Sequence, residues 1–389
     1  AAKEARPGMQ VVVVDPRRTA TCELADLHLA IAPGADVALF NRLLCHIVDT
    51  GRVDPDFLQG VEGFDAALAA ARQEGETGLE DAALRRFLDL WVNTERVVTV
   101  YSQGVNQSAQ GTDKVNAILN CHLATGRIGR AGMGPFSVTG QPNAMGGREV
   151  GGMANLLSAH RDLADPAHRA EVAALWGVPS VPATPGKTAV EMFEAAADGE
   201  IRALWIACTN PAQSLPDQAT VRRALERAEF VIVQEAFATT ATCAFADLLL
   251  PATTWGEKDG TVTNSERRIS RVRPAVAAPG GTRHDWQIAL DFARRLEARL
   301  YPGQPTLFPY ERPEAIWQEH RESTRGRDLD ITGLSYPMLE EAPRQWPLRE
   351  GQDQGKARLY EDGIFPTADG KARFADVAYV PVAEARESR

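Results

Sequence analysis

The chain contains 389 residues, of which 44% are hydrophobic and 24% are charged. This composition is ordinary for a globular protein, and the length suits about two or three domains. The formal net charge is −10 and the arginines are scattered, which argues against a nucleic-acid-binding surface. No apolar run approaches the roughly 18 residues of a transmembrane helix, so we predict no membrane span.

Five apolar segments are predicted to be short β-strands, and each of the first three is followed by a polar loop and an amphipathic helix. The predicted strands are VVVVD (11–15), RVVTVY (96–101), IRALWIAC (201–208), FVIVQE (230–235) and ADLLLP (246–251). The helices that follow the first three are predicted over 34–51, 112–126 and 219–228.

Apolar strands that alternate with helices are typical of a parallel sheet covered on both faces. We therefore predict the α/β fold class, with two doubly wound, mainly parallel sheet domains. Residues 1–140 would form a dinucleotide-binding domain and residues 141–330 a second α/β domain. Residues 331–389, rich in proline, glycine and charge, are predicted to be a linker towards a further domain.

Two aspartates follow predicted strands. Asp15 ends the first strand, where a carboxylate can accept both hydroxyls of a ribose, although an Asp-Pro pair is equally compatible with a simple turn. The Asp36 carboxylate could accept the paired N–H donors on a guanine edge. An acidic residue at the start of a helix can equally serve as the N-cap of that helix. The sequence has no GxGxxG motif, which leaves a nicotinamide dehydrogenase unsupported.

Three loops after strands supply amide and hydroxyl groups but few charges: SQGVNQ (102–107), CTNPAQSLPD (208–217) and QEAFATT (234–240). Such groups suit a heterocycle with many hydrogen-bonding edges. Together, at the carboxyl ends of parallel strands, the loops favour one or two long, nucleotide-like ligands. The five cysteines are far apart and form no metal-binding motif, so we predict buried cysteines, a reducing compartment and no metal ligand in this chain.

The stretch FSVTGQPNAMGGREVGG (136–152) contains five glycines. Glycine permits positive φ and a close approach of a ligand to the backbone. The cluster therefore indicates either a strained turn or a ligand that fits closely against the backbone. Arg148 lies inside the cluster, and Gln141 is a possible second polar contact. A surface loop is the alternative explanation.

Five motifs, in their order along the chain, resemble the molybdopterin oxidoreductases that carry two molybdopterin guanine dinucleotides. They are VVDPRRTATCELAD, YSQGVNQSAQG, TGRIGRAGMGPFSVTGQPNAMGGREVGG, TNPAQSLPD and ADLLLPATTWGEKDGTVTNSERRISR. Within that family GQPNAMGGREVGG is most similar to the cytoplasmic assimilatory nitrate reductases. Periplasmic nitrate reductases usually carry Ser and Cys where this chain has Asn143 and Met145, and formate dehydrogenases carry an arginine where Thr139 stands.

The resemblance implies roles for individual residues. Arg148 would anchor and polarise nitrate, and Gln141 would orient it. The glycine-rich backbone of residues 136–152 would pass beneath the molybdenum and the pterins. Asp15 and Asp36 would contact the guanosine of one cofactor. The remaining cofactor-binding positions that the resemblance implies are Gly104, Asn106, Gln107, Thr139, Gly140, Asn210, Glu235 and Thr239.

The implied function is reduction of nitrate to nitrite by oxygen-atom transfer at a bis-molybdopterin guanine dinucleotide centre. Electrons would come from an electron-donor protein or reductase subunit through a [4Fe–4S] centre, whose cysteines, like a molybdenum-ligating cysteine, would precede residue 1. We therefore expect a central fragment that is inactive alone and belongs to a cytoplasmic enzyme. The alternatives are a formate dehydrogenase or other oxidoreductase on the same cofactor, and a non-catalytic scaffold subunit of an electron-transfer complex.

Overall fold

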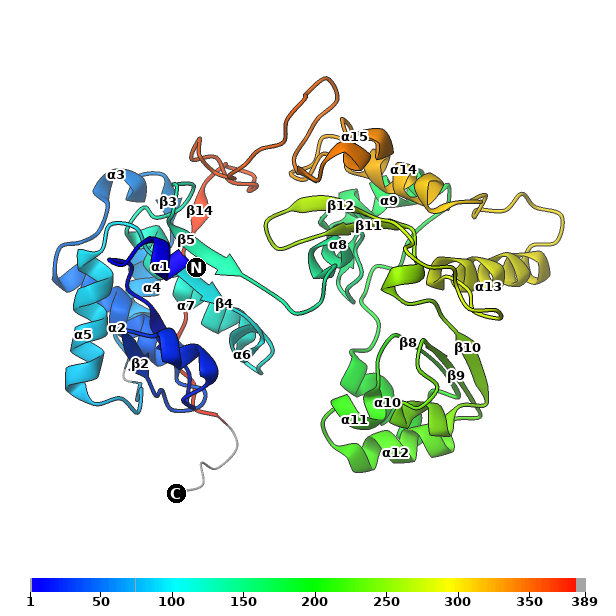
Figure 1. Cartoon of the computed structure of the whole chain (residues 1–389), viewed down its shortest axis with the longest axis horizontal. Helices are drawn as coiled ribbons and strands as arrows, with labels where there is room; N and C mark the ends of the chain where they lie inside the picture. Colours follow the sequence, from blue (N-terminus) through cyan, green and yellow to red (C-terminus); the bar gives the residue numbers. More distant parts are fainter. Residues whose placement is uncertain (1, 74, 383–389) are drawn as a thin grey trace. The chain divides into compact units, whose positions relative to one another are not determined.

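The computed structural model describes residues 2–73 and 75–382, and it divides into two compact units. Unit 1 comprises residues 1–140 and 357–389, and unit 2 comprises residues 141–356. Both units combine helices with short parallel strands (Figure 1), and the predicted α/β fold class is confirmed. Within the described residues, no helix is both long and apolar enough to cross a membrane.

Unit 1 contains three pairs of parallel strands and the helices that cover them. In chain order its elements are α1 (Ala2–Ala5), β1 (Val12–Val14), η1 (Ala20–Leu24), β2 (Leu27–Leu29), α2 (Asp36–Asp49), α3 (Pro55–Leu58), β3 (Val61–Glu62), α4 (Phe64–Ala71), α5 (Asp81–Asn93), β4 (Val98–Tyr101), α6 (Gln103–Asn106), α7 (Gly111–Ala124), β5 (Gly134–Ser137) and β14 (Ala372–Arg373). The pairs are β1 with β2, β4 with β5, and β3 with β14.

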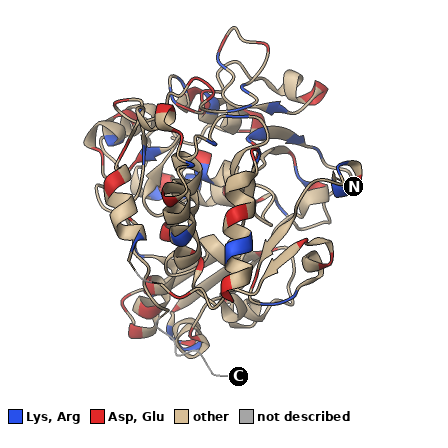
Figure 2. Ribbon diagram, turned by 90° about the vertical axis from the view of Figure 1, so that its left-hand side faces the viewer, with Lys and Arg blue, Asp and Glu red and all other residues tan. Residues whose placement is uncertain are grey.

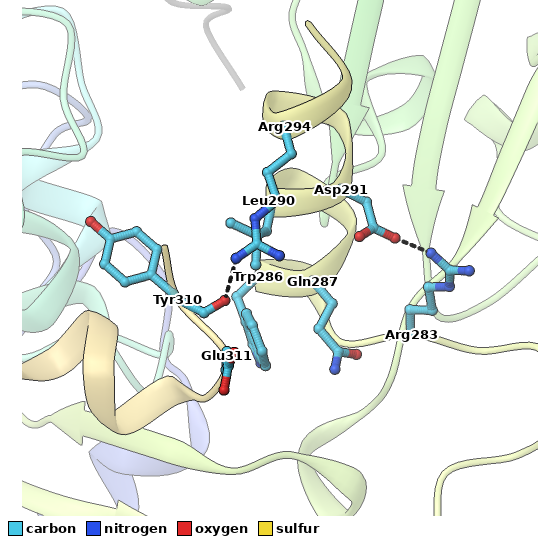
Figure 3. Close-up of a pocket in the computed structure, with 8 residues that line it drawn as sticks. All are labelled: Arg283, Trp286, Gln287, Leu290, Asp291, Arg294, Tyr310 and Glu311. Carbon is cyan, nitrogen blue, oxygen red and sulfur yellow. Dashed lines mark hydrogen bonds and ion pairs between the residues drawn. The ribbon is translucent and has the colours of Figure 1, made fainter. Parts of the chain in front are cut away.

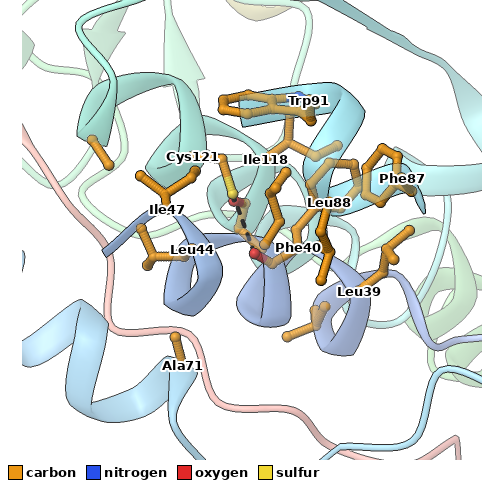
Figure 4. Packing of buried hydrophobic residues seen from close by; sticks show 14 of the residues in the cluster. Leu39, Phe40, Leu44, Ile47, Ala71, Phe87, Leu88, Trp91, Ile118 and Cys121 are labelled. Carbon is orange, nitrogen blue, oxygen red and sulfur yellow. Dashed lines mark hydrogen bonds between the residues drawn. The ribbon is translucent and has the colours of Figure 1, made fainter. Parts of the chain in front are cut away.

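The core of unit 1 lies where helices α2, α5 and α7 meet (Figure 4). Helix α2 buries Leu39, Leu43 and Ile47 completely, at a spacing of four residues that places them on one helix face. Cys121 of α7 is also fully buried, and its thiol donates to the carbonyl oxygen of Phe40 at 3.2 Å. Burial raises the pKa of this thiol, so it behaves as a small hydrophobic side chain.

Unit 2 contains one parallel and one antiparallel three-stranded sheet. In chain order its elements are α8 (Ala144–Glu149), β6 (Leu156–Leu157), β7 (Arg161–Asp162), α9 (Pro166–Trp176), α10 (Ala189–Asp198), β8 (Ala203–Ala207), α11 (Pro211–Ser214), α12 (Gln218–Arg227), β9 (Phe230–Glu235), η2 (Ala241–Phe245), β10 (Leu248–Pro251), η3 (Trp255–Glu257), β11 (Gly260–Thr263), β12 (Arg268–Val272), α13 (Asp285–Leu300), α14 (Pro313–Ser323), α15 (Tyr336–Glu341) and β13 (Arg344–Gln345).

The parallel sheet of unit 2 has the strand order β10-β9-β8, and its buried face packs against α10 and α12. Leu204 and Ile206 alternate with exposed residues along β8, which is the pattern of a strand with one covered face. All five predicted strand segments contain a strand of the structure. The antiparallel sheet β11-β12-β13 was not predicted, because its hairpin turns through Arg267 at φ 66° rather than through glycine.

Residues 331–389, which the sequence suggests are a linker, contribute buried residues to both units. Leu348 is fully buried in unit 2. In unit 1, Phe374 packs edge-on against Phe64 with ring centroids 5.2 Å apart. The side-chain amide of Asn120 donates to the carbonyl oxygen of Ala375 at 2.8 Å and accepts its N–H at 3.1 Å. Proline and glycine here mark turns between packed residues rather than a free linker.

Replacing Phe374 with alanine should cost about 3 to 4 kcal/mol of unfolding free energy, because it removes a buried ring from the core. Phe374 is only 7% exposed. The control is Ile364→Ala in the same segment, where the side chain is 65% exposed and the expected loss is below about 0.5 kcal/mol. Urea unfolding followed by circular dichroism measures both. Equal, small losses in the two variants would show that the segment does not stabilise unit 1.

Candidate functional site

Helix α8 carries Arg148 and is held against strand β11 at both of its ends. Asn143, at the N-cap, accepts the backbone N–H of Thr263 through its side-chain oxygen at 2.9 Å. At the other end the hydroxyl of Thr263 donates to Oε2 of Glu149, also at 2.9 Å. One residue of β11 therefore contacts both ends of the helix.

Glu149 is almost completely buried, with 3% of its surface exposed. Its second carboxylate oxygen, Oε1, accepts the indole N–H of Trp346 at 2.5 Å. Burial raises the pKa of this carboxyl above its ordinary value, and the bonds from Thr263 and Trp346 offset part of that rise. A buried acid with both oxygens hydrogen-bonded is an anchor for the helix rather than a surface charge.

The glycines of 136–152 fall into two groups. Three are required by packing, because a Cβ would lie 2.2 Å from the Asn143 side chain at Gly146, 2.5 Å from the Leu157 backbone at Gly151, and 2.9 Å from the Gly147 carbonyl oxygen at Gly152.

The other two, Gly140 and Gly147, face open space, with no described atom within 4 Å of an added Cβ. These two leave backbone that a ligand can approach.

Arg148 lies in the last turn of α8 and is half-buried. Within the described parts of the chain, no carboxylate lies within ion-pair distance of its guanidinium. A guanidinium that is partly removed from water without a carboxylate partner favours binding of an anion. Gln141 is exposed on the segment that precedes α8, and Thr139 is half-buried after β5.

The carboxyl ends of β8, β9 and β10 share one edge of the parallel sheet in unit 2, as the sequence suggests for the loops that follow them. Asn210 lies at this edge, but its amide is used inside the protein. Its oxygen accepts the hydroxyl of Thr242 at 2.7 Å, and its nitrogen donates to Gln213 at 3.0 Å. Glu235 accepts the N–H of the next residue at 2.7 Å through one carboxylate oxygen, and Thr239 is exposed.

A charged cluster at the same edge was not among the predicted residues. The Asp285 carboxylate, in the first turn of α13, binds the Lys258 ammonium at 2.5 Å and the Gln234 amide at 2.8 Å. Burial raises the pKa of Asp285, but these hydrogen bonds outweigh it and hold the pKa below its ordinary value. Cys208 lies beside them and is exposed, contrary to the expected burial of the cysteines. The only indication of this cluster in the sequence was an acidic residue, Asp285, at the start of a helix.

In unit 1 the predicted residues follow β1, β2 and β4. One carboxylate oxygen of Asp15 accepts the N–H of Arg17 at 2.8 Å. Asp36 forms an ion pair with Lys114 at 2.7 Å, with side chains only 17% and 6% exposed, so its charge is already neutralised within the unit. This contact favours a structural role for Asp36 over contact with a guanine.

The loop after β4 is open to a ligand. An added Cβ at Gly104 would meet no described atom within 4 Å, and Gln107 is exposed. The side-chain oxygen of Asn106 is buried without a hydrogen-bond partner in the described structure. An unsatisfied buried acceptor of this kind favours a missing donor from a bound group.

Two cavities lie in unit 2. The larger, of about 430 Å³, lies between α13 and residues 310–311 (Figure 3). Three of its charged groups have protein partners: Arg283 binds Asp291, and Arg294 donates to the carbonyl oxygen of Tyr310 at 2.8 Å. The smaller, of about 220 Å³, is lined in part by Asn143, Gly146 and Glu149. Neither has Arg148 in its wall, and among the described residues no group of His, Cys, Asp or Glu is placed to hold a metal.

Replacing Glu149 with glutamine should flatten the pH dependence of stability. Because the folded state raises the pKa of this carboxyl, its contribution is fully present below the unfolded pKa and is lost as pH rises through the folded pKa. The neutral amide avoids that loss. We therefore expect Glu149→Gln to gain unfolding free energy relative to the wild type as the pH rises above the ordinary pKa of a glutamate, about 4.3.

Urea unfolding at several pH values measures this difference. Glu194→Gln, at an exposed position of α10, controls for the change in net charge. A difference between Glu149→Gln and the wild type that stays constant over the range contradicts the prediction.

Residues 1–295 match the family described as molybdopterin oxidoreductase. A nitrate reductase of Klebsiella oxytoca is 44% identical over 395 residues, covering 98% of this chain and 44% of that protein. A nitrate reductase of Shewanella frigidimarina is 42% identical over 390 residues, covering 96% and 41%. The chain thus spans about half the length of the curated relatives it matches.

Among solved structures, acetylene hydratase from Pelobacter acetylenicus is similar, with a TM-score of 0.68 and 16% identity, over 96% of this chain and 52% of that one. At this identity the similarity concerns the fold alone, and it agrees with the α/β architecture. The family match extends over far more than half of the chain and confirms the resemblance carried by the motifs. The chain belongs to the molybdopterin oxidoreductase family.

Proposed function

We propose that this chain is the central part of a molybdenum-dependent nitrate reductase, in which Arg148 binds nitrate. The observation that carries the proposal is a half-buried guanidinium without a carboxylate partner in the described structure, next to the open backbone of Gly147. The relatives named nitrate reductases, at 44% and 42% identity, support the choice of substrate.

The residues present fit a large pterin nucleotide in three respects. Open backbone at Gly104, Gly140 and Gly147 leaves room for flat rings to lie close to the main chain. The unsatisfied oxygen of Asn106 can accept a ring N–H. Asp15 uses one carboxylate oxygen for a local turn and can offer the other to ribose hydroxyls.

We assign Asp15, Gly104, Asn106, Gln107, Thr139 and Gly140 to one molybdopterin guanine dinucleotide. Glu235 and Thr239 would contact the second, and Asn210 would shape that site by holding Thr242. When bound, the molybdenum cofactor supplies the redox chemistry and the acceptor for the oxygen atom of nitrate.

Arg148 supplies a local positive charge for an anionic substrate in a protein of net charge −10. Acidic and basic residues are interspersed along the ribbons (Figure 2), so attraction of an anion requires a local cation. The planar guanidinium matches the planar oxygens of nitrate with two parallel hydrogen bonds. These bonds would hold the anion and draw electron density from the bond that breaks, while Gln141 would orient it.

Other features of the proposed enzyme follow from the resemblance. The [4Fe–4S] centre, the molybdenum ligand and the binding surface for an electron-donor protein would lie in other parts of the enzyme. The similarity of GQPNAMGGREVGG to assimilatory enzymes supports nitrate assimilation in the cytoplasm. Thr139, in the place of the arginine of formate dehydrogenases, argues against formate, and an Arg148 with no carboxylate partner in the described structure argues against a scaffold subunit.

Replacing Asp15 in the holoenzyme should lower cofactor content more than it lowers stability. Asp15→Ala removes both the charge and the turn acceptor, whereas Asp15→Asn keeps an oxygen for the N–H of Arg17. Loss of a charged hydrogen bond predicts at least about a threefold fall in guanine dinucleotide content for both variants. Nucleotide analysis and melting temperature measure the two effects. Normal content with a lowered Tm in Asp15→Ala alone would assign Asp15 to the turn.

Replacing Arg148 in the holoenzyme should raise KM for nitrate and lower kcat. Removing a charged partner from a partly desolvated site costs about 2 to 4 kcal/mol, or roughly thirtyfold to a thousandfold in kcat/KM for Arg148→Ala. Arg148→Lys keeps the charge but loses the planar fork, so its loss should be smaller. Molybdenum content should remain near the wild-type level because the arginine serves the substrate.

Steady-state assays with nitrate and with formate, using a reduced dye or an oxidised dye respectively, test the assignment. Arg222→Ala, at an exposed position of α12, is the control for the lost charge. A kcat/KM for Arg148→Ala within about threefold of wild type would reject Arg148 as the anchor. Oxidation of formate without reduction of nitrate would reject nitrate as the substrate.

A further inference from the structure

We infer that Thr263 is a positioning residue for nitrate binding, because it fixes the helix that carries Arg148. The inference rests on the proposed function and extends it from the anchor to the residue that holds the anchor in place. Thr263 is 4% exposed and lies at the end of β11.

Helix α8 needs external support. It has only six residues, Ala144–Glu149, and two of them are glycine. Such a short helix forms few internal hydrogen bonds, and each glycine increases the entropy lost on ordering. Its position is therefore set by contacts with the rest of unit 2.

Thr263 supplies a contact at each end of the helix. Its backbone N–H is bound by Asn143 and its hydroxyl donates to Glu149, each at 2.9 Å. Two separated attachments to one residue resist both tilting and rotation, whereas a single attachment would leave the helix free to pivot. Trp346 binds the remaining oxygen of Glu149 and fixes the direction of that carboxylate.

The orientation of α8 determines the direction of the Arg148 side chain. Consecutive residues of an α-helix are about 100° apart around its axis. Glu149 is anchored in the protein interior, so the angle at which α8 docks fixes the direction of the neighbouring Arg148. Because the guanidinium stands at the end of a long side chain, a small rotation of α8 displaces it by more than it displaces the backbone. A bidentate contact with nitrate is sensitive to such a displacement.

The glycines make α8 dependent on the two hydrogen bonds from Thr263 to Asn143 and Glu149, which together form a clamp. Gly146 makes room for the Asn143 side chain that binds Thr263, since a Cβ there would lie 2.2 Å from Asn143 Oδ1. Gly152 permits a backbone contact with Gly147 after the helix ends. The glycines thus allow Asn143 and Glu149 to reach Thr263. They also leave few other side chains that could hold α8 if these hydrogen bonds were lost.

The experiment removes the hydroxyl of Thr263 in the holoenzyme while keeping its shape. We expect Thr263→Val to raise both KM and the dissociation constant for nitrate by about fivefold to twentyfold. Titration calorimetry on resting enzyme, without reductant, gives the dissociation constant independently of turnover. KM for the electron-donating dye and the molybdenum content should stay near the wild-type values.

Two control variants separate positioning from general destabilisation. Thr263→Ser keeps the hydroxyl and should restore nitrate affinity to within about twofold of wild type. Thr261→Val makes the same chemical change two residues earlier on β11, where the hydroxyl has no hydrogen bond in the described structure. It should leave nitrate affinity unchanged. If Thr263→Val does not fold, Trp346→Phe loosens Glu149 by removing its other donor and should raise the same constants.

A double-mutant cycle with Arg148→Ala tests whether Thr263 affects nitrate binding through Arg148. If Thr263 acts through Arg148, Thr263→Val should change nitrate affinity by less than about twofold once the arginine is absent. Equal effects of Thr263→Val in both backgrounds, or a loss of activity proportional to molybdenum content with unchanged nitrate affinity, would overturn the inference. A normal affinity in Arg148→Ala alone would instead overturn the proposed function, so the two failures are distinct.

Discussion

The attachment of helix α8 to strand β11 is the constraint on which the candidate site depends. Thr263 binds Asn143 and Glu149, one at each end of the helix, and Trp346 completes the hydrogen bonding of the buried Glu149 carboxylate. A buried acid is costly unless its oxygens are satisfied, and here both are. The hydrogen-bonded carboxylate fixes a six-residue helix that is too short to hold an arginine in place by itself.

The parallel sheets supply the second part of the arrangement. Strands β8, β9 and β10 run in the same direction, so the polar loops that follow them lie at one edge. The tertiary structure adds Asp285 and Lys258 to that edge from the segments after β10. On the proposed function, the binding groups for an extended nucleotide would come from short loops on a rigid support, which would limit the conformational entropy lost when the ligand binds.

Several polar residues that suit a ligand also form contacts within the fold. Asp36 neutralises Lys114 in the interior of unit 1, and Asn210 holds Thr242 beside η2. Arg148 is different, because its guanidinium has no carboxylate partner in the described structure. The distinction between a satisfied polar group and an unsatisfied one is a stronger indication of function than the residue type, since buried polar groups are nearly always paired.

The sequence by itself determined the α/β class, the five main strand segments and the family, because these depend on local apolar patterns and on motifs that are contiguous in the chain. It also singled out Arg148, since one cation among five glycines is visible without a structure. Only the tertiary structure decided that three of those glycines serve packing, that Asp36 is paired with Lys114, and that the tail after residue 330 belongs to both cores. These features join residues separated by up to several hundred positions, such as Asn41 and Val377. Local propensity carries no information about such contacts, because they form only when distant segments bury their apolar surfaces together.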